Sequence, residues 1–333
     1  MQKSYLLGVD GGNTKTDFML FDTQGNLVDY LKTGSCSHEA LADGYAGAKR
    51  ELNRHITTLC ERNKASRSGI VSSVFGLAGI DNNEQQMQMT TILSDLDFHH
   101  FLAINDSFLP IKAASRDGTG VCSINGTGSV TGGIDRVQRY LQVGGIGAAV
   151  GDSGGGRYFS ERTICAVYNE LFRNGKPTTM TKPLLALLNV TDDKVLMEAI
   201  SKNYYGRKIK DIEFMKILFN STNREDEVAV GIVLDIATQL ANSVIGCIHR
   251  LDFGKKVNIV TAGSIWDKCE TPFLYQQFCD HIQKNLIIDS EFIKPNLPPI
   301  CGAVNWAFQL YEGVEQGCHR MESISEEITR ALS

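Results

Sequence analysis

One short pattern occurs twice in this chain of 333 residues, and that repetition most limits the folds open to it. Residues 5–21 and residues 120–134 each consist of an apolar stretch, a glycine turn and a second apolar stretch. The two copies lie about 115 residues apart, and such a spacing predicts two related halves. Apolar runs of this length around a turn are typical of paired strands.

The segments that follow each copy alternate between strand and helix patterns. In the first half we expect a third strand at 27–31, a helix at 39–62, a strand at 70–75, a helix at 84–95 and a strand at 101–104. In the second half we expect a strand at 140–143, a helix at 229–248, a strand at 257–261, a helix at 270–284, a strand at 286–288 and a last long helix beyond residue 303.

Duplicated βββαβαβ units indicate an α/β fold with two lobes. We place the first lobe at residues 1–117 and the second at residues 118–333. The second lobe would contain the helical insertions, and its last helix is expected to pack back on the first lobe.

Glycine is abundant and proline is scarce, with 32 and 7 residues respectively. Residues 118–156 alone contain 13 glycines, without the three-residue period of collagen. Because the flanking segments are apolar and strand-like, a flexible linker is also excluded. The remaining explanation is a backbone that turns tightly and comes close to a ligand.

Charge and cysteine content narrow the class of protein. A net charge of -5 without a basic patch argues against a nucleic-acid partner. The longest apolar segment, 228–248, contains Asp235, Gln239 and Asn242, so we expect no membrane span. Nine cysteines without a CxxC pair, and a start without a signal peptide, predict a cytoplasmic protein with free thiols.

Two glycine loops are candidates for binding phosphates. The first comprises Gly11, Gly12, Asn13, Thr14, Lys15 and Thr16, and the second contains Gly126, Thr127 and Gly128. Backbone N–H groups in such loops turn toward anions, and two loops could hold a polyphosphate from both sides. Neither has the spacing of a Walker loop or a Rossmann fingerprint, and the alternative for each is a plain hairpin.

Carboxylates and small residues at other strand ends complete the candidate site. Asp10 could hold hydrated Mg²⁺. Asp106 could accept a proton from a substrate hydroxyl, or it could cap the next helix. Asp152 could bind a polar substrate or cap a helix. Ala262 and Gly263 could accept an adenine or ribose, or form a plain turn.

Together these segments resemble the actin/hexokinase/Hsp70 ATPase superfamily. More closely, the chain resembles the N-acetylglucosamine kinase and BadF/BadG/BcrA/BcrD-type ATPase family. Residues 8–16, 76–79, 105–106, 126–129, 144–145 and 151–152 carry the likeness in family order and spacing, and the turns at 262–263 and 301–303 extend it to about residue 310.

The resemblance implies a two-lobed actin-like (ribonuclease H-like) fold with a deep cleft, and an ATP-dependent sugar kinase. Its substrates would be ATP and an amino sugar phosphorylated at the 6-hydroxyl, and a homodimer is compatible with it. Asp106 would be the general base, and Asp10 would hold Mg²⁺ through water. The two glycine loops would bind phosphates, and Ala262, Gly263 and Gly302 the adenosine. The sugar would contact Ser37, Gly79, Asp106, Gly144, Gly145 and Asp152.

The sequence departs from the family pattern where the sugar is expected. Ser37 stands where the family has a sugar-contacting Asn, and Val130 stands where an Asn is common. Residues Ile146, Ala148 and Ser153 replace a Trp, a His and a Glu of the family pattern. The phosphate-facing motifs are intact, so the sequence supports phosphoryl transfer more than any one sugar. N-acetylmuramic acid and glucosamine remain alternatives to N-acetylglucosamine.

Two other functions are open to the same fold. An ATPase activator of a dehydratase or reductase would need cysteines for an iron–sulfur cluster and an Asp-x-Gly-Gly-Gln-Asp signature, which residues 123–128 lack. A sugar-sensing regulator would need a DNA-binding segment, and no basic helix is evident.

Overall fold

Two five-stranded sheets with the same topology form the centre of the molecule, which we describe from a computed structural model covering residues 3–332. The first sheet has the order β3 (Leu27–Gly34), β2 (Lys15–Asp22), β1 (Tyr5–Gly11), β4 (Ile70–Leu77), β5 (Phe101–Ile104). The second has the order β8 (Tyr140–Gly144), β7 (Ser129–Ile134), β6 (Gly120–Asn125), β9 (Lys256–Ala262), β10 (Asp289–Ile293).

Strand direction also matches between the sheets. In each, the first three strands form an antiparallel meander, and the last two run parallel to the first strand of that meander. The repeated pattern in the sequence therefore corresponds to a repeated sheet, and the predicted α/β fold of two related halves is confirmed. The division at residues 117 and 118 stays a prediction.

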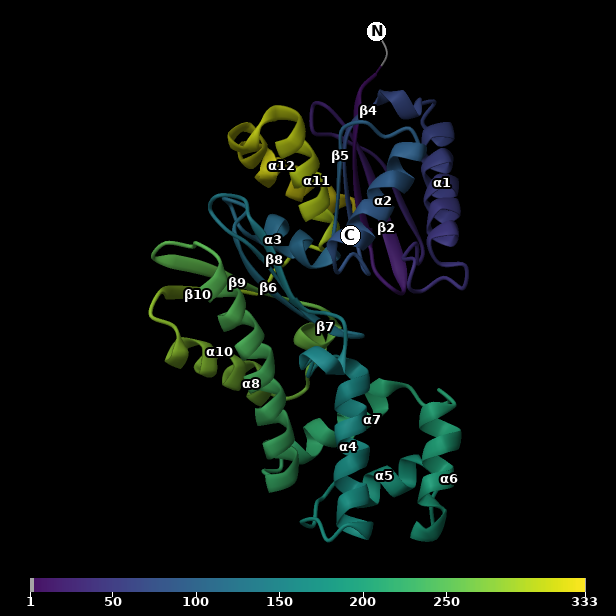
Figure 1. Ribbon diagram of the computed structural model, residues 1–333, viewed down its shortest axis with the longest axis vertical. Coiled ribbons are helices and arrows are strands. Elements are labelled where there is room, and N and C mark those ends of the chain that lie inside the picture. The colour runs from purple at the N-terminus through teal and green to yellow at the C-terminus, as the bar shows by residue number, and fades with distance from the viewer. Residues whose placement is uncertain (1–2, 333) are drawn as a thin grey trace.

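Helices cover the sheets and extend the second half (Figure 1). The helices are α1 (Gly44–Arg62), α2 (Asn83–Asp95), α3 (Leu109–Ala114), α4 (Gly155–Phe172), α5 (Thr181–Leu187), α6 (Leu196–Ile200), α7 (Asp211–Thr222), α8 (Glu227–Arg250), α9 (Ser264–Lys268), α10 (Pro272–Asn285), α11 (Ile300–Glu312) and α12 (Val314–Leu332). In Figure 1, α4 to α7 form a separate group of helices at the end far from the first sheet.

Three apolar clusters make up the core. One lies between the first sheet and helices α1 and α2, and a second surrounds α8 in the second half. The third contains Leu109 of α3 and Trp306 of α11, together with side chains from both sheets. Helix α11 packs on β1 and β4, so a segment from the end of the chain covers one face of the first sheet (Figure 1).

Helix α8 shows how the apolar spacing is used. Asp226 caps the helix by accepting a hydrogen bond from Ala229 N at 2.9 Å. Among residues 3–332, α8 is the one helix long and apolar enough to cross a membrane, and 50% of its most apolar stretch is buried in the fold. Because its buried side chains line the apolar core of the second half, α8 is placed as a core helix.

The structure differs from the sequence predictions at three element boundaries. Helix α1 begins at Gly44 rather than at residue 39, since Gly44 has a φ of +55°. The strand expected at 286–288 lies instead at Asp289–Ile293, where it pairs with β9, and Ile287 is exposed. The last helix is broken at Gly313, which has a φ of +93°.

Candidate functional site

The ends of strands from both sheets open into one cavity of about 360 Å³. This is where open α/β sheets place their ligands, beyond the carboxyl ends of the strands. Most of the predicted site residues line it, namely Asp10, Gly12, Asn13, Thr14, Lys15, Gly79, Asp106, Gly126, Thr127, Gly128, Gly145, Ala262 and Gly263. The predicted residues outside its lining are Gly11, Thr16, Ser37, Gly144, Asp152 and Gly302.

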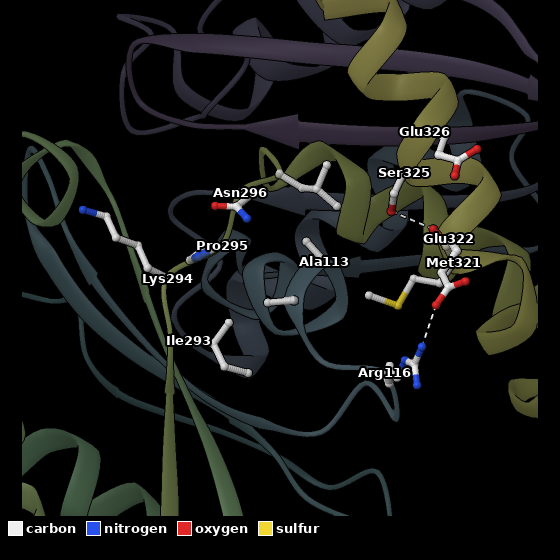
Figure 2. A pocket seen from close by; sticks show the side chains of 12 residues that line it. Ala113, Arg116, Ile293, Lys294, Pro295, Asn296, Met321, Glu322, Ser325 and Glu326 are labelled. Carbon is white, nitrogen blue, oxygen red and sulfur yellow. Dashed lines mark hydrogen bonds and ion pairs between the residues drawn. The ribbon is translucent and has the colours of Figure 1, made fainter.

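A larger cavity, of about 880 Å³, lies elsewhere between α3, residues 293–297 and α12. None of the predicted site residues lines it. Figure 2 shows Arg116 directed at Glu322, and the two form an ion pair at 2.6 Å. We therefore place the chemistry in the smaller cavity, which Asp106 and both glycine loops line.

The first glycine loop is a tight turn between β1 and β2. Gly12 N donates to Lys15 O at 2.9 Å, which leaves Asn13 and Thr14 exposed at the tip. Gly11 and Thr16 lie behind the loop rather than in the cavity. A Cβ added at Gly11 would lie 2.6 Å from Leu77, and the Thr16 hydroxyl accepts a hydrogen bond from Cys36 N at 3.0 Å.

The second glycine loop is held against the start of α4. Asn125 Oδ1 accepts from Gly155 N at 2.8 Å, and Gly126 O accepts from Gly156 N at 2.9 Å. No atom lies within 4 Å of the position a Cβ would take on Gly128, so the backbone there is open to a ligand. The positive end of the α4 dipole also lies against this loop, which favours a negatively charged group nearby.

Gly263 and Gly302 permit close approaches of backbone. Gly263 has a φ of +104°, and a Cβ added there would lie 2.6 Å from Asn125 O. A Cβ added at Gly302 would overlap Leu109 O, so Gly302 seats α11 on α3. Gly302 itself lies outside the cavity lining, while Pro299 lines it. Adenosine binding at either glycine stays a prediction.

Four carboxylates line the cavity: Asp10, Asp106, Asp81 and Glu39. Burial, and then the charge of Asp17, raise the pKa of Asp10 to about 7, while Lys15 lowers it in part. Burial, and then the charges of Asp10 and Asp81, raise the pKa of Asp106 to about 8. Shifts of this size at a cleft are typical of functional carboxylates.

Asp106 does not cap the turn that follows β5, although capping was the alternative to a catalytic role for this residue. It begins the 3₁₀ turn Asp106–Phe108 directly after β5, and the cap of that turn is Asn105. Asn105 Oδ1 accepts from Ser107 N at 2.9 Å. The Asp106 carboxylate therefore lines the cavity, where burial and then the charges of Asp10 and Asp81 raise its pKa.

Asp81 and Glu39 are site residues that the sequence reasoning missed. Asp81 Oδ1 accepts from Asn105 Nδ2 at 3.0 Å and from Gln142 Nε2 at 2.7 Å. Since Gln142 is on β8, the second of these bonds joins the two halves. The signal that could have found Asp81 is its position after the 76–79 turn, because a polar residue beyond a strand end reaches the ligand edge of a sheet.

Two side chains that were predicted to bind the sugar make hydrogen bonds to the backbone of the cavity wall. Asp152 Oδ2 accepts from Gly145 N at 2.9 Å and from Gly147 N at 2.6 Å, which fixes the glycine-rich loop. The Ser37 hydroxyl donates to Ala78 O at 3.0 Å and is itself buried. Direct contact of either side chain with a sugar stays a prediction.

The cavity suits a hydrated cation and a polyphosphate. Asp10 is a carboxylate whose ionised form is disfavoured by burial and by Asp17, so a cation beside it would be stabilising. Among the side chains that the structure describes, residues 3–313 and 320–331, no group of three or more His, Cys, Asp or Glu is placed to hold a metal ion directly. Magnesium usually keeps several waters, and a single carboxylate with phosphate oxygens is an ordinary set of ligands for it.

Two matching sheets and a shared cavity with two glycine loops define a two-lobed ATPase of the actin-like fold. The chain belongs to the BadF/BadG/BcrA/BcrD ATPase family, whose model matches residues 7–307. The family predicted from the sequence motifs is thereby confirmed.

Two curated relatives cover most of the chain. An N-acetylmuramic acid/N-acetylglucosamine kinase of Clostridium acetobutylicum is 23% identical over 295 residues, which are 84% of this chain and 91% of the relative. An N-acetyl-D-glucosamine kinase of Dictyostelium discoideum is 24% identical over 281 residues, which are 80% and 86% of the two chains.

Solved structures confirm the fold. A Chromobacterium violaceum protein described as an N-acetylglucosamine kinase superposes with a TM-score of 0.65 at 17% identity, over 92% of this chain and 99% of that one. A Streptomyces griseus glucokinase solved with glucose and AMPPNP gives a TM-score of 0.52 at 15% identity, over 92% of this chain and 100% of that one.

Proposed function

We propose that this ATPase-family member is a sugar kinase that transfers the γ-phosphoryl group of ATP to the 6-hydroxyl of an N-acetylglucosamine-type amino sugar. The observation that carries the proposal is the position of Asp106 in one cavity with both glycine loops. The names of the curated relatives support the choice of an amino sugar as acceptor. We place this kinase function in the cytoplasm, and a homodimer is compatible with that function.

Asp106 would act as the general base. It accepts the proton of the sugar O6 as that oxygen forms a bond to the γ-phosphorus, while the bond from phosphorus to the β–γ bridging oxygen breaks and ADP leaves. Its raised pKa suits it to take up a proton near neutral pH.

The two glycine loops would hold the phosphates in line with the sugar hydroxyl. Backbone N–H groups of both loops, the Thr14 and Thr127 hydroxyls and the Lys15 ammonium group are among the donors at the cavity wall. Asp10 would hold a water of the magnesium shell, and bound magnesium supplies neutralisation of phosphate charge. Positioning and charge neutralisation are the main requirements of phosphoryl transfer.

A coupled assay of ADP release with N-acetylglucosamine, glucosamine, glucose and no sugar tests the proposal. We expect release that depends on an amino sugar, a 6-phosphate product by phosphorus NMR, and no turnover of the 6-deoxy sugar. Asp106→Asn should lose about two to four decades of kcat. The exposed Asp280→Asn is the matched control and should retain full activity.

Two results would contradict the proposal. Asp106→Asn turnover within a few-fold of the unsubstituted protein would remove the general base from the mechanism. ADP release that no sugar stimulates, with absorbance near 400 nm after anaerobic purification, would point instead to an activator with an iron–sulfur cluster.

A further inference from the structure

Two acidic side chains besides Asp10 and Asp106 line the cavity, Asp81 and Glu39, and we refer to these two as its acidic end. Asp81 lies next to the residue that precedes Asp106, because its Oδ1 accepts a hydrogen bond from Asn105 Nδ2 at 3.0 Å. Burial raises the pKa of Asp106 and of Glu39, and the charge of Asp81 contributes to both shifts. A hexopyranose with its O6 at Asp106 would therefore share the cavity with the carboxylates of the acidic end.

Positive charge is scarce among the residues that line the cavity. Lys15 is the one lysine or arginine among the lining residues that the structure describes. It belongs to the first glycine loop, and its Nζ is 2.6 Å from the Asp17 carboxylate. His38 is near Asp81, and burial lowers the pKa of its ring. Lys15 is thus the one lining cation of the described residues that could offset Asp81 and Glu39, and it is already paired with Asp17.

Glu39 is an exposed side chain at the rim of the cavity, and it leans on Gly79. A Cβ added at Gly79, which has a φ of +87°, would lie 2.8 Å from Glu39 Cγ and 3.0 Å from its Cδ. The side chain therefore packs directly on the Gly79 backbone. With the side chains of residues 3–313 and 320–331 its carboxylate makes no hydrogen bond or ion pair, although its backbone N donates to the Ser37 hydroxyl at 3.3 Å. A carboxylate in this situation acts on its surroundings mainly through its charge.

We propose that Glu39, supported by Asp81, determines substrate choice by excluding sugars that carry a carboxylate. The inference rests on the proposed kinase function. N-acetylmuramic acid carries a lactyl carboxylate at O3, and that group would enter the acidic end of the cavity. Like charges that meet without a compensating cation are a common means of rejecting a competing ligand. The accepted substrates are accordingly neutral N-acetylglucosamine and cationic glucosamine.

Sugar competition and sugar binding test this inference. We expect kcat/KM for N-acetylglucosamine to exceed that for N-acetylmuramic acid by about tenfold or more, as close like charges predict. Glu39→Gln should raise the ratio of kcat/KM for N-acetylmuramic acid to kcat/KM for N-acetylglucosamine by at least about threefold. The exposed Glu61→Gln is the matched control and should change neither value. Added salt should narrow the difference between the sugars.

The amide of N-acetylmuramic acid separates charge from size, because it keeps the bulk of the lactyl group without its charge. Turnover of the amide well above that of the acid supports the inference, and equal rejection of both overturns it in favour of a steric cause. Calorimetric binding without ATP separates the two proposals. Equal affinity for the neutral and the anionic sugar overturns the role of Glu39, while selective binding of the neutral sugar without turnover overturns only the kinase function.

Discussion

Asp106 and Asp10 illustrate how single residues acquire reactivity from their surroundings. Each lies at the end of a strand, partly exposed to the cavity, with its nearest charged neighbours mostly other carboxylates. Burial and like charges disfavour ionisation, and both raise the pKa. Two measurable consequences follow, one for the reaction rate and one for stability.

The rate should depend on pH through Asp106. A general base must be ionised, so kcat/KM should fall as the pH is lowered below the raised pKa of about 8. This acidic limb of the pH profile should lie at a pH far above the usual pKa of an aspartate. Cations bound near Asp10 should move the limb to lower pH. A pH profile of the unsubstituted enzyme measures it. The residual rate of Asp106→Asn should lack this limb, and a limb near pH 4 would contradict the assignment.

Stability should depend on pH through Asp10. Its pKa is about 7 in the folded protein and near 4 when unfolded, so the folded state holds more protons between these values. The free energy of unfolding contributed by this group therefore falls as the pH rises from 4 to 7. Asp10→Asn should stabilise the ligand-free protein at pH 8 by about 1 kcal/mol and have no such effect at pH 4. Thermal unfolding at the two pH values, with a chelator present, measures the difference.

At the scale of elements, glycines decide how closely the helices and strands approach. Gly302 lets the start of α11 lie against the backbone of α3. Gly263 has the same effect where β9 passes β6, and it needs its positive φ as well. The long helix α8 contains glycines without such neighbours, for example Gly231. Glycine thus permits a close approach of backbone at some positions and has no such role at others, according to its surroundings.

Gly302→Ala and Gly231→Ala form a matched pair. The added methyl group at position 302 would overlap Leu109 O, so α11 must move, and we expect a loss of about 2 kcal/mol or more in the free energy of unfolding. At position 231 nothing lies within 4 Å, so alanine should stabilise the helix by about 0.5–1 kcal/mol. Urea unfolding measures both, and equal effects of the two substitutions would contradict this account.

At the scale of the whole molecule, Asp81 links the two halves across the cavity. Its Oδ1 accepts from Gln142 Nε2 of β8 at 2.7 Å, and from Asn105 Nδ2 beside the proposed base. The hydrogen bond from Gln142 to Asp81 therefore reports on movement of one half relative to the other. Closure of two lobes around a substrate is a common way to exclude water from phosphoryl transfer.

A double-mutant cycle of Asp81→Asn and Gln142→Leu measures that link. Because the bond involves an ionised acceptor, we expect a coupling energy of about 1 kcal/mol in urea unfolding of the ligand-free protein. The Gln142→Leu variant should also raise KM for the sugar more than it lowers kcat. Strict additivity of the two substitutions would show that the bond does not join the halves in solution.

The local sequence pattern alone determined many of the strands and helices of this protein. The strands around both glycine loops, helix α8 and the strand ending before Asp106 were predicted within a few residues, because alternation, helical spacing and glycine turns are properties of neighbouring residues. The matching halves followed from the repeat of that local pattern. The shift of the strand from 286–288 to Asp289–Ile293 shows the limit, since an edge strand takes its register from its partner.

Only the tertiary structure decided which of the predicted residues reach the cavity. Thr16, Ser37 and Gly302 have suitable chemistry, yet they face the interior, because neighbouring elements fix the side on which each lies. Asp81 and Glu39 come from segments about 40 residues apart, and Gln142 comes from the other sheet. Their meeting depends on sheet pairing over long separations, which no local pattern contains. The acidic lining formed by Asp81 and Glu39, and the substrate choice inferred from it, are therefore properties of the folded chain.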